Sequence, residues 1–178
     1  MPDWQEALLA VARQQFDARV LGHPAPPVPA AAGGPAAAGA FVSVRIAGDL
    51  RGCLGALHGT DSLTATIARL AADVAHRDPR FAPVAAEELA QSALEISVLT
   101  EPERVVDPSS IAVGRHGLIV EQGRASGLLL PQVAVEHGWS RDAFLDHACV
   151  KAGLPRDAWR QGAIIYRFEA VVFGEAVR

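Results

Sequence analysis

The stretch FVSVRIAGDLRGCLGAL, residues 41–57, decides the fold class expected for this chain. Its β-branched and aromatic residues form two runs on either side of Ala47-Gly48-Asp49, a combination typical of a hairpin turn. Paired strands that follow each other directly need no crossover helix and therefore run antiparallel. The stretch predicts a β-hairpin.

Helices and further strands are expected on both sides of this hairpin. Apolar residues at three- and four-residue steps, together with capping and stop signals, predict helices over residues 4–20, 131–138 and 140–151. A further helix is expected to begin at a cap formed by Asp61 or Ser62 and to end at the Asp78-Pro79 break. Strand patterns cover residues 94–98, 117–121, 127–130 and 164–173, with 117–130 as a second hairpin. Because the strands come as hairpins without a regular βαβ rhythm, we expect an α+β fold of antiparallel sheets with flanking helices.

Residues 22–40 interrupt the pattern after the first helix. They contain five prolines and four glycines and almost no polar side chains. Such a segment cannot continue a helix and offers few packing or hydrogen-bonding anchors, so it predicts a flexible or partly polyproline connector.

Length and charge restrict the class of protein. A chain of 178 residues, half of them apolar, is long enough for one domain or for two small lobes that share a core. The formal net charge of −4 provides no cationic surface for a phosphate backbone, so nucleic-acid binding is not expected.

The sequence also indicates where the protein works. No apolar run reaches about 18 residues, and charged residues interrupt the first 20, so neither a membrane span nor a secretory signal is expected. The two cysteines, Cys53 and Cys149, cannot form a disulfide framework. These features favour a reducing, cytoplasmic setting.

Cys53 is the first candidate for chemistry. If residues 50–55 are extended, Arg51 and Cys53 share a face about 6–7 Å apart, where the guanidinium could lower the pKa of the thiol. The neighbouring Gly52 and Gly55 weaken a strand unless another group approaches closely, so we predict that they help to bind a ligand.

A structural explanation of Cys53 competes with the catalytic one. A free cysteine is commonly a small core residue. A two-residue hairpin loop would place Val42 and Val44 on the same face as Arg51 and Cys53, which makes that face mostly apolar. The catalytic interpretation therefore depends on whether the thiol is open to solvent.

Other candidates come from outside the hairpin. His116 precedes a predicted strand and could act as a base for Cys53 if the fold brings them together, although a turn histidine bonded to the backbone is the alternative. Arg80 could bind a carboxylate or phosphate, although Asp78-Pro79 also reads as a helix stop. Cys149 fits a packing role within a helix. No histidine pair has a metal-ligand spacing, so neither a metal nor another cofactor is expected.

Several of these segments resemble the AMMECR-type domain, a family whose bacterial and archaeal members are described as protein A of the AmmeMemoRadiSam system. The resemblance runs in order from about Phe41 to Phe173, so we treat residues 1–178 as one such domain. The segments that carry it are Leu50-Arg51-Gly52-Cys53-Leu54-Gly55, Asp78-Pro79-Arg80-Phe81, Ile96-Ser97-Val98-Leu99, Gly114-Arg115-His116-Gly117-Leu118, Gly127-Leu128-Leu129-Leu130-Pro131-Gln132-Val133-Ala134 and Cys149-Val150-Lys151-Ala152-Gly153-Leu154.

The resemblance implies a larger and a smaller lobe built on antiparallel strands, with a cleft near the Arg-Gly-Cys segment. It implies no established reaction. It does imply a Memo-like protein and a radical-SAM protein as partners in an unknown pathway.

Three functions follow from these residues. The first is an enzyme or processing factor for a small molecule, with Cys53 as nucleophile and with Arg51 and His116 as electrostatic and proton-transfer aids. The second is a binding module for a Memo-like partner that performs no chemistry. The third, a nucleic-acid-associated regulator, rests on a local basic patch of Arg51, Arg77 and Arg80.

Overall fold

The computed structural model describes residues 2–30, 32–57 and 61–176. The chain divides into two compact units: unit 1 comprises residues 1–98 and 171–178, and unit 2 comprises residues 99–170. Both contain antiparallel strand pairs and flanking helices, which confirms the predicted α+β class.

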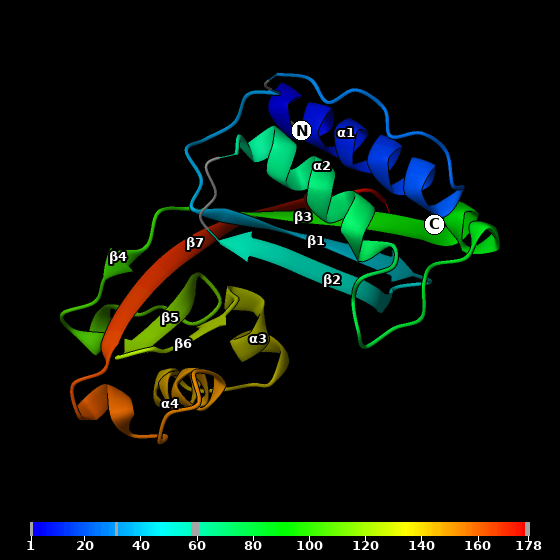
Figure 1. The fold of residues 1–178 in the computed structure, drawn as a ribbon. Coiled ribbons are helices and arrows are strands. Elements are labelled where there is room, and N and C mark those ends of the chain that lie inside the picture. Colours follow the sequence, from blue (N-terminus) through cyan, green and yellow to red (C-terminus); the bar gives the residue numbers. More distant parts are fainter. Residues whose placement is uncertain (1, 31, 58–60, 177–178) are drawn as a thin grey trace. The chain divides into compact units, whose positions relative to one another are not determined.

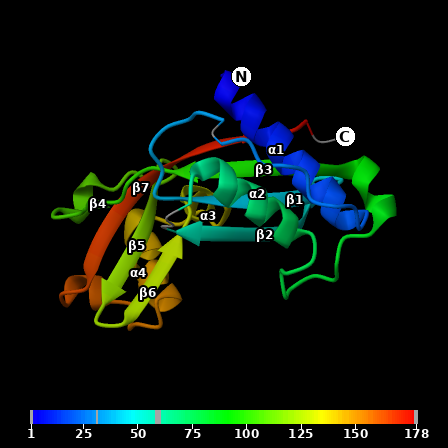
Figure 2. The ribbon, with the colours of Figure 1, turned by 45° about the horizontal axis from the view of Figure 1, so that its top comes forward.

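Unit 1 is a sheet with two helices over one face. Helices α1 (Asp3–Val20) and α2 (Leu63–Val74) lie side by side across the strands (Figure 1, Figure 2). The strand order is β2 (Asp49–Leu57), β1 (Gly39–Ile46), β3 (Ser92–Leu99) and then β7 (Ile164–Gly174), which has residues in both units. The largest fully buried side chains of this core are Leu8, Phe16, Val42, Val44, Ile67, Leu94, Ile96 and Val98.

Helix α2 begins at the predicted cap and ends earlier than predicted. The Ser62 hydroxyl accepts a hydrogen bond from the Ala65 N–H at 3.2 Å, which satisfies one of the free donors of the first turn. The helix stops at Val74 rather than at the Asp78-Pro79 break. Its end is set by Ala75, whose carbonyl accepts from the N–H of Val84 in the following loop.

The turn of the first hairpin lies where the sequence predicted it. Ala47 and Gly48 both have positive φ angles, 51° and 89°, between the paired residues Ile46 and Asp49. A two-residue turn of this kind matches the right-handed twist of the flanking strands.

The register of this hairpin differs from the prediction. Val44 pairs with Gly52, and Arg51 is the extra residue of a β-bulge. The bulge shifts all later pairs by one position, so Cys53 lies opposite Ser43. The prediction that Cys53 shares a face with the valines of β1 is therefore wrong, since a shift of one residue exchanges the two faces of a strand.

The connector is better anchored than its composition suggested. The Pro26 carbonyl accepts from the Gln15 amide at 2.8 Å, and the Ala32 N–H donates to the Thr64 hydroxyl at 2.9 Å. Ala38 is buried, and β1 begins at Gly39, within the predicted segment. On the side of the connector, these contacts are made by backbone groups and by the small side chain of Ala38. A prediction from its few polar side chains therefore did not anticipate them.

Unit 2 is a smaller sheet covered by short helices. Strand β5 (His116–Gln122) pairs with β6 (Ala125–Leu129) on one side and with β7 on the other, and β4 (Glu103–Arg104) pairs with β7. Helix α4 (Arg141–Lys151) is capped by Ser140 as predicted and packs on β5 and β6, while α3 (Pro131–Glu136) packs on β5. The core of the unit includes Leu118, Val120, Phe144, Leu145 and Cys149.

The remaining short elements are 3-10 helices: η1 (Ala86–Gln91) in unit 1, and η2 (Pro108–Ser110) and η3 (Ala158–Arg160) in unit 2. Within the described part of the chain, no helix combines the length and the apolar character needed to cross a membrane.

Candidate functional site

Cys53 lies on β2 with its side chain half-buried. Its backbone N–H donates to Asp78 Oδ2 at 2.9 Å, and its carbonyl accepts from Arg80 Nη2 at 3.3 Å. Since β2 is the terminal strand in the sheet order, an edge position would otherwise leave such groups without a strand partner. The Asp78-Pro79-Arg80 turn therefore takes the place of a neighbouring strand at Cys53.

Asp78 and Arg80 form a tight ion pair beside Cys53. Arg80 donates to both carboxylate oxygens, at 2.9 and 2.7 Å, while Asp78 is only 4% exposed. These hydrogen bonds hold the pKa of Asp78 well below its usual range, so the carboxylate is ionised and is a poor proton acceptor at neutral pH. The pKa of Arg80 is raised, chiefly by its hydrogen bond to Asp78.

Arg51 is directed to a different partner. Its Nε and Nη2 atoms donate to the two carboxylate oxygens of Glu88 at 2.9 and 3.1 Å, and it also bonds to the carbonyls of Ala82 and Pro83. The Arg51 bonds lower the pKa of Glu88. Arg51 thus joins the 82–88 segment to β2, and Arg80 is the cation beside Cys53.

The two glycines of the segment are explained by packing. A Cβ atom on Gly52 would lie 3.1 Å from Cγ2 of Val74, and one on Gly55 would lie 2.2 Å from the ring of Phe41. Gly52 therefore admits helix α2, and Gly55 admits an aromatic ring from the paired strand. Their predicted role in ligand binding gains no support from these contacts.

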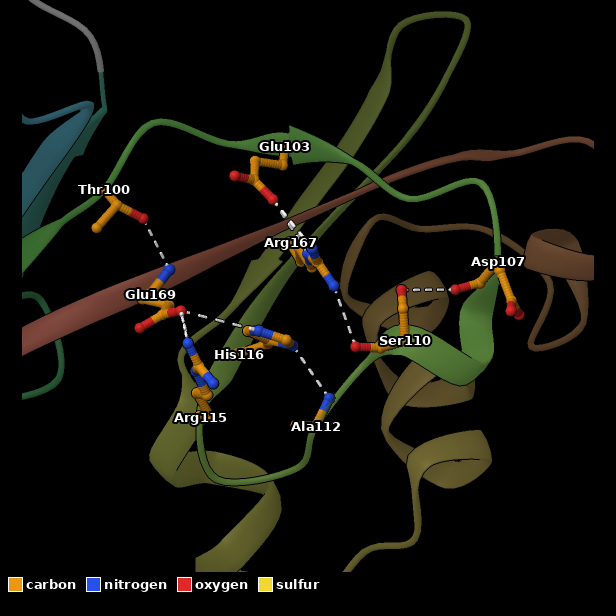
Figure 3. A network of polar contacts seen from close by, with 9 residues as sticks. All are labelled: Thr100, Glu103, Asp107, Ser110, Ala112, Arg115, His116, Arg167 and Glu169. Carbon is orange, nitrogen blue, oxygen red and sulfur yellow. Dashed lines mark hydrogen bonds and ion pairs between the residues drawn. The ribbon is translucent and has the colours of Figure 1, made fainter.

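His116 belongs to unit 2, whereas Cys53 belongs to unit 1. It is the first residue of β5 and is 7% exposed. Its Nδ1 accepts from the Ala112 N–H at 3.0 Å, which places the proton of the neutral ring on Nε2 (Figure 3). Burial lowers the pKa of His116, with a further contribution from Arg167, so the neutral ring is favoured at pH 7. In this form His116 presents a hydrogen-bond donor, rather than the base that the sequence suggested.

His116 is one of the residues that line a charged pocket of about 720 Å³. Two arginine–glutamate pairs line it: Arg115 contacts Glu169 at 2.8 Å, and Arg167 contacts Glu103 at 3.1 Å (Figure 3). In both cases strand pairing is responsible, because Glu103 lies opposite Arg167, and His116, next to Arg115, lies opposite Glu169.

Most of this pocket was not identified from the sequence. Arg167 and Glu169 are two residues apart and therefore share a face of β7, but this spacing does not indicate their partners. Those partners come from residues more than 50 positions away in the chain. Among the described residues, no group of three or more histidine, cysteine, aspartate or glutamate side chains is arranged to hold a metal ion.

Comparison with known proteins identifies the family. The AMMECR1 family model matches residues 9–173. This chain belongs to the AMMECR1 family. The match confirms the resemblance inferred from the motifs and covers both units.

Relatives in the AMMECR1 family include archaeal proteins. A protein of Methanosarcina acetivorans is 45% identical over 142 residues, which cover 77% of this chain and 71% of that protein. A Methanocaldococcus jannaschii protein is 46% identical over 134 residues, which cover 71% of this chain and 67% of that protein. The crystal structure of an uncharacterised protein from Pyrococcus horikoshii is 37% identical, with a TM-score of 0.88 over 99% of this chain and 94% of that one. Family membership thus establishes the fold and leaves the reaction open.

Proposed function

We propose that the protein acts on a small molecule, with the Cys53 thiol as nucleophile and Arg80 as the cation that attracts its anionic form. The observation that supports this proposal is the half-exposed position of Cys53 on a strand whose backbone is held at that residue by Asp78 and Arg80. A cation close to an accessible thiol favours the thiolate, which is the reactive form. A fixed backbone also limits the motion of the reacting atom.

The proposed step is a nucleophilic substitution or acyl transfer. The Cys53 thiolate forms one S–C bond to an electrophilic carbon of the substrate, and the leaving group departs with the electron pair of the broken bond. The thiol proton passes to solvent, because both oxygens of Asp78 already accept hydrogen bonds and its lowered pKa makes it a poor proton acceptor. Arg80 remains 57% exposed on its side chain and is accessible to an anionic group of the substrate.

The proposal also includes partner proteins and two alternative functions. On the family resemblance, we expect a Memo-like protein and a radical-SAM protein to act in the same pathway. The alternative is a non-catalytic module that presents this surface to the Memo-like partner. A nucleic-acid-associated regulator is the weaker alternative, because the net charge of −4 opposes binding to a polyanion.

Alkylation of the native protein tests the role of Cys53. At pH 7, iodoacetamide should modify Cys53 while Cys149 remains unmodified, because Cys149 is fully buried and its pKa is raised by burial. Arg80→Ala should slow the modification of Cys53 by roughly threefold or more, and Arg80→Lys should restore most of the rate. Peptide mass spectrometry over time measures both rates.

Arg77→Ala is the matched control, since Arg77 is three positions from Arg80, its side chain is 66% exposed, and among the described residues its one ion pair is with Asp73. It should leave the rate unchanged. Cys53→Ala should retain the melting temperature but fail to complement a deletion strain. If Cys53 reacts only on unfolding, or if Cys53→Ala complements normally, the nucleophile proposal is wrong and the binding module is favoured.

A further inference from the structure

The pocket of unit 2 contains a histidine nitrogen that forms no hydrogen bond with any described residue. The His116 side chain is 9% exposed, and its Nε2 lies 4.0 Å from Glu169 Oε1, too far for a hydrogen bond. No fully buried side-chain nitrogen or oxygen among the described residues lacks a partner. Nε2 must therefore reach the open space of the pocket that His116 lines.

His116 Nε2 and the Glu169 carboxylate each have a fixed hydrogen-bonding role. The bond from the Ala112 N–H to Nδ1 makes Nε2 a donor. Glu169 is an acceptor, because its bond from Arg115 lowers the pKa of the carboxyl and keeps it ionised at neutral pH. The backbone of Glu169 is also held, since its N–H donates to the Thr100 hydroxyl at 2.9 Å.

His116 Nε2 and Glu169 Oε1 are 4.0 Å apart, so an oxygen to the side of the line that joins them can lie at hydrogen-bonding distance, about 2.8 Å, from both. That oxygen must accept from His116 and donate to Glu169. A hydroxyl group does both, whereas an ionised carboxylate or phosphate oxygen has no proton to donate and an ammonium group has no lone pair. The geometry thus selects a hydroxyl oxygen over a charged group.

The charges of the pocket agree with this selection. Arg115 is paired with Glu169 and Arg167 with Glu103, so each cation already has a carboxylate partner. The side chain of Glu101 also lines the pocket and forms no ion pair with any described residue. The lining is therefore net negative and disfavours an anion, while the alternating donors and acceptors suit several hydroxyl groups at once.

We propose that this pocket binds a neutral small molecule with several hydroxyl groups, of the sugar or polyol class, and that one hydroxyl oxygen accepts a hydrogen bond from His116 Nε2 and donates one to Glu169 Oε1. The volume of about 720 Å³ is within the usual range for small-molecule sites. The site is formed entirely by unit 2 and involves neither Cys53 nor Arg80.

Ligand-observed saturation-transfer NMR on the full chain tests this site. The probes are D-glucose, D-ribose, myo-inositol and glycerol, with acetate, inorganic phosphate and methylammonium as charged comparisons. At least one polyol should receive saturation from the wild-type protein. His116→Asn should weaken its binding at least about tenfold, because the amide oxygen keeps the bond from Ala112 but the donor at the Nε2 position is lost.

Two further variants complete the experiment. His116→Gln can place an amide N–H near the Nε2 position and should retain more binding than His116→Asn. Ser109→Ala, in unit 2 but outside the pocket lining, should bind as the wild type does. Thermal melts establish that each variant is folded. The proposal is overturned if no polyol binds, if only the charged probes bind, or if folded His116→Asn binds as tightly as the wild type.

Discussion

Asp78 depends on its partners because it is almost fully removed from water. Its oxygens accept hydrogen bonds from the backbone N–H groups of Cys53 and Arg80 and from the Arg80 guanidinium. A buried carboxylate is tolerated only when such bonds replace its hydration. The position of Cys53 therefore depends on a residue 25 positions later in the chain.

Substitution of Asp78 should cost stability in a pH-dependent way. Asp78→Asn should lower the free energy of unfolding by about 2 kcal/mol at pH 7, because the charged hydrogen bonds are lost. The folded state lowers the pKa of Asp78, so its stabilisation is present above the pKa of the unfolded chain and is lost as the pH falls through the lower, folded value. Urea denaturation at pH 7 and pH 3 should show that the difference between wild type and variant narrows at pH 3.

Asp73→Asn provides the control for this comparison. Asp73 pairs with Arg77, whose side chain is 66% exposed, so the pair contributes little in water. The free energy of unfolding of Asp73→Asn should lie within about 0.5 kcal/mol of the wild-type value at both pH 7 and pH 3. If Asp73→Asn lowered the free energy of unfolding as much as Asp78→Asn does, the burial of Asp78 would not be the cause of its effect on stability.

At the scale of elements, the bulge at Arg51 connects strand geometry to site geometry. It moves Cys53 away from the face of the buried valines of β1 and leaves its side chain half-exposed. Arg51, the bulged residue, also bonds to Glu88, so η1, which precedes β3, is attached to β2 at this point.

The contact between β6 and α4 gives a second test at this scale. A Cβ atom on Gly127 would lie 2.4 Å from the backbone nitrogen of Ala152, at the end of α4. Backbone cannot rotate aside as a side chain can, so Gly127→Ala should destabilise the protein by about 2 kcal/mol or more. Equilibrium urea unfolding measures this loss.

Gly123→Ala is the comparison, in the turn between β5 and β6. Gly123 has a φ of 61° and no atom within 4 Å of the added Cβ, so only backbone strain of about 1 kcal/mol is expected. Equal losses of unfolding free energy in Gly127→Ala and Gly123→Ala would contradict the close approach of α4 to β6.

At the scale of the molecule, unit 2 is one continuous segment with its own core. Residues 99–170 enclose an apolar cluster that includes Leu118, Phe144 and Leu145. We therefore expect the isolated fragment to fold and to show a cooperative thermal transition by circular dichroism. Phe144→Ala should lower its melting temperature strongly, because it removes a fully buried ring. A fragment without a cooperative transition would show that unit 2 needs unit 1 in order to fold.

The sequence by itself determined the elements and the family. The Ser140 cap and the turn at Ala47-Gly48 act over a few residues and were found where they were predicted, and of the two predicted caps of α2, Asp61 and Ser62, the structure has Ser62. The ordered motifs from Phe41 to Phe173 identified the AMMECR1 family before any fold was known.

Only the tertiary structure decided which charged groups meet. It assigned Arg51 to Glu88, Arg80 to Asp78 and Cys53, and Glu169 to Arg115 beside His116. A bulge of one residue exchanged the faces of β2, and strand pairing brought together residues more than 50 positions apart. Local patterns contain no information on such pairings, because they depend on register and on contacts between distant segments rather than on the preferences of neighbouring residues.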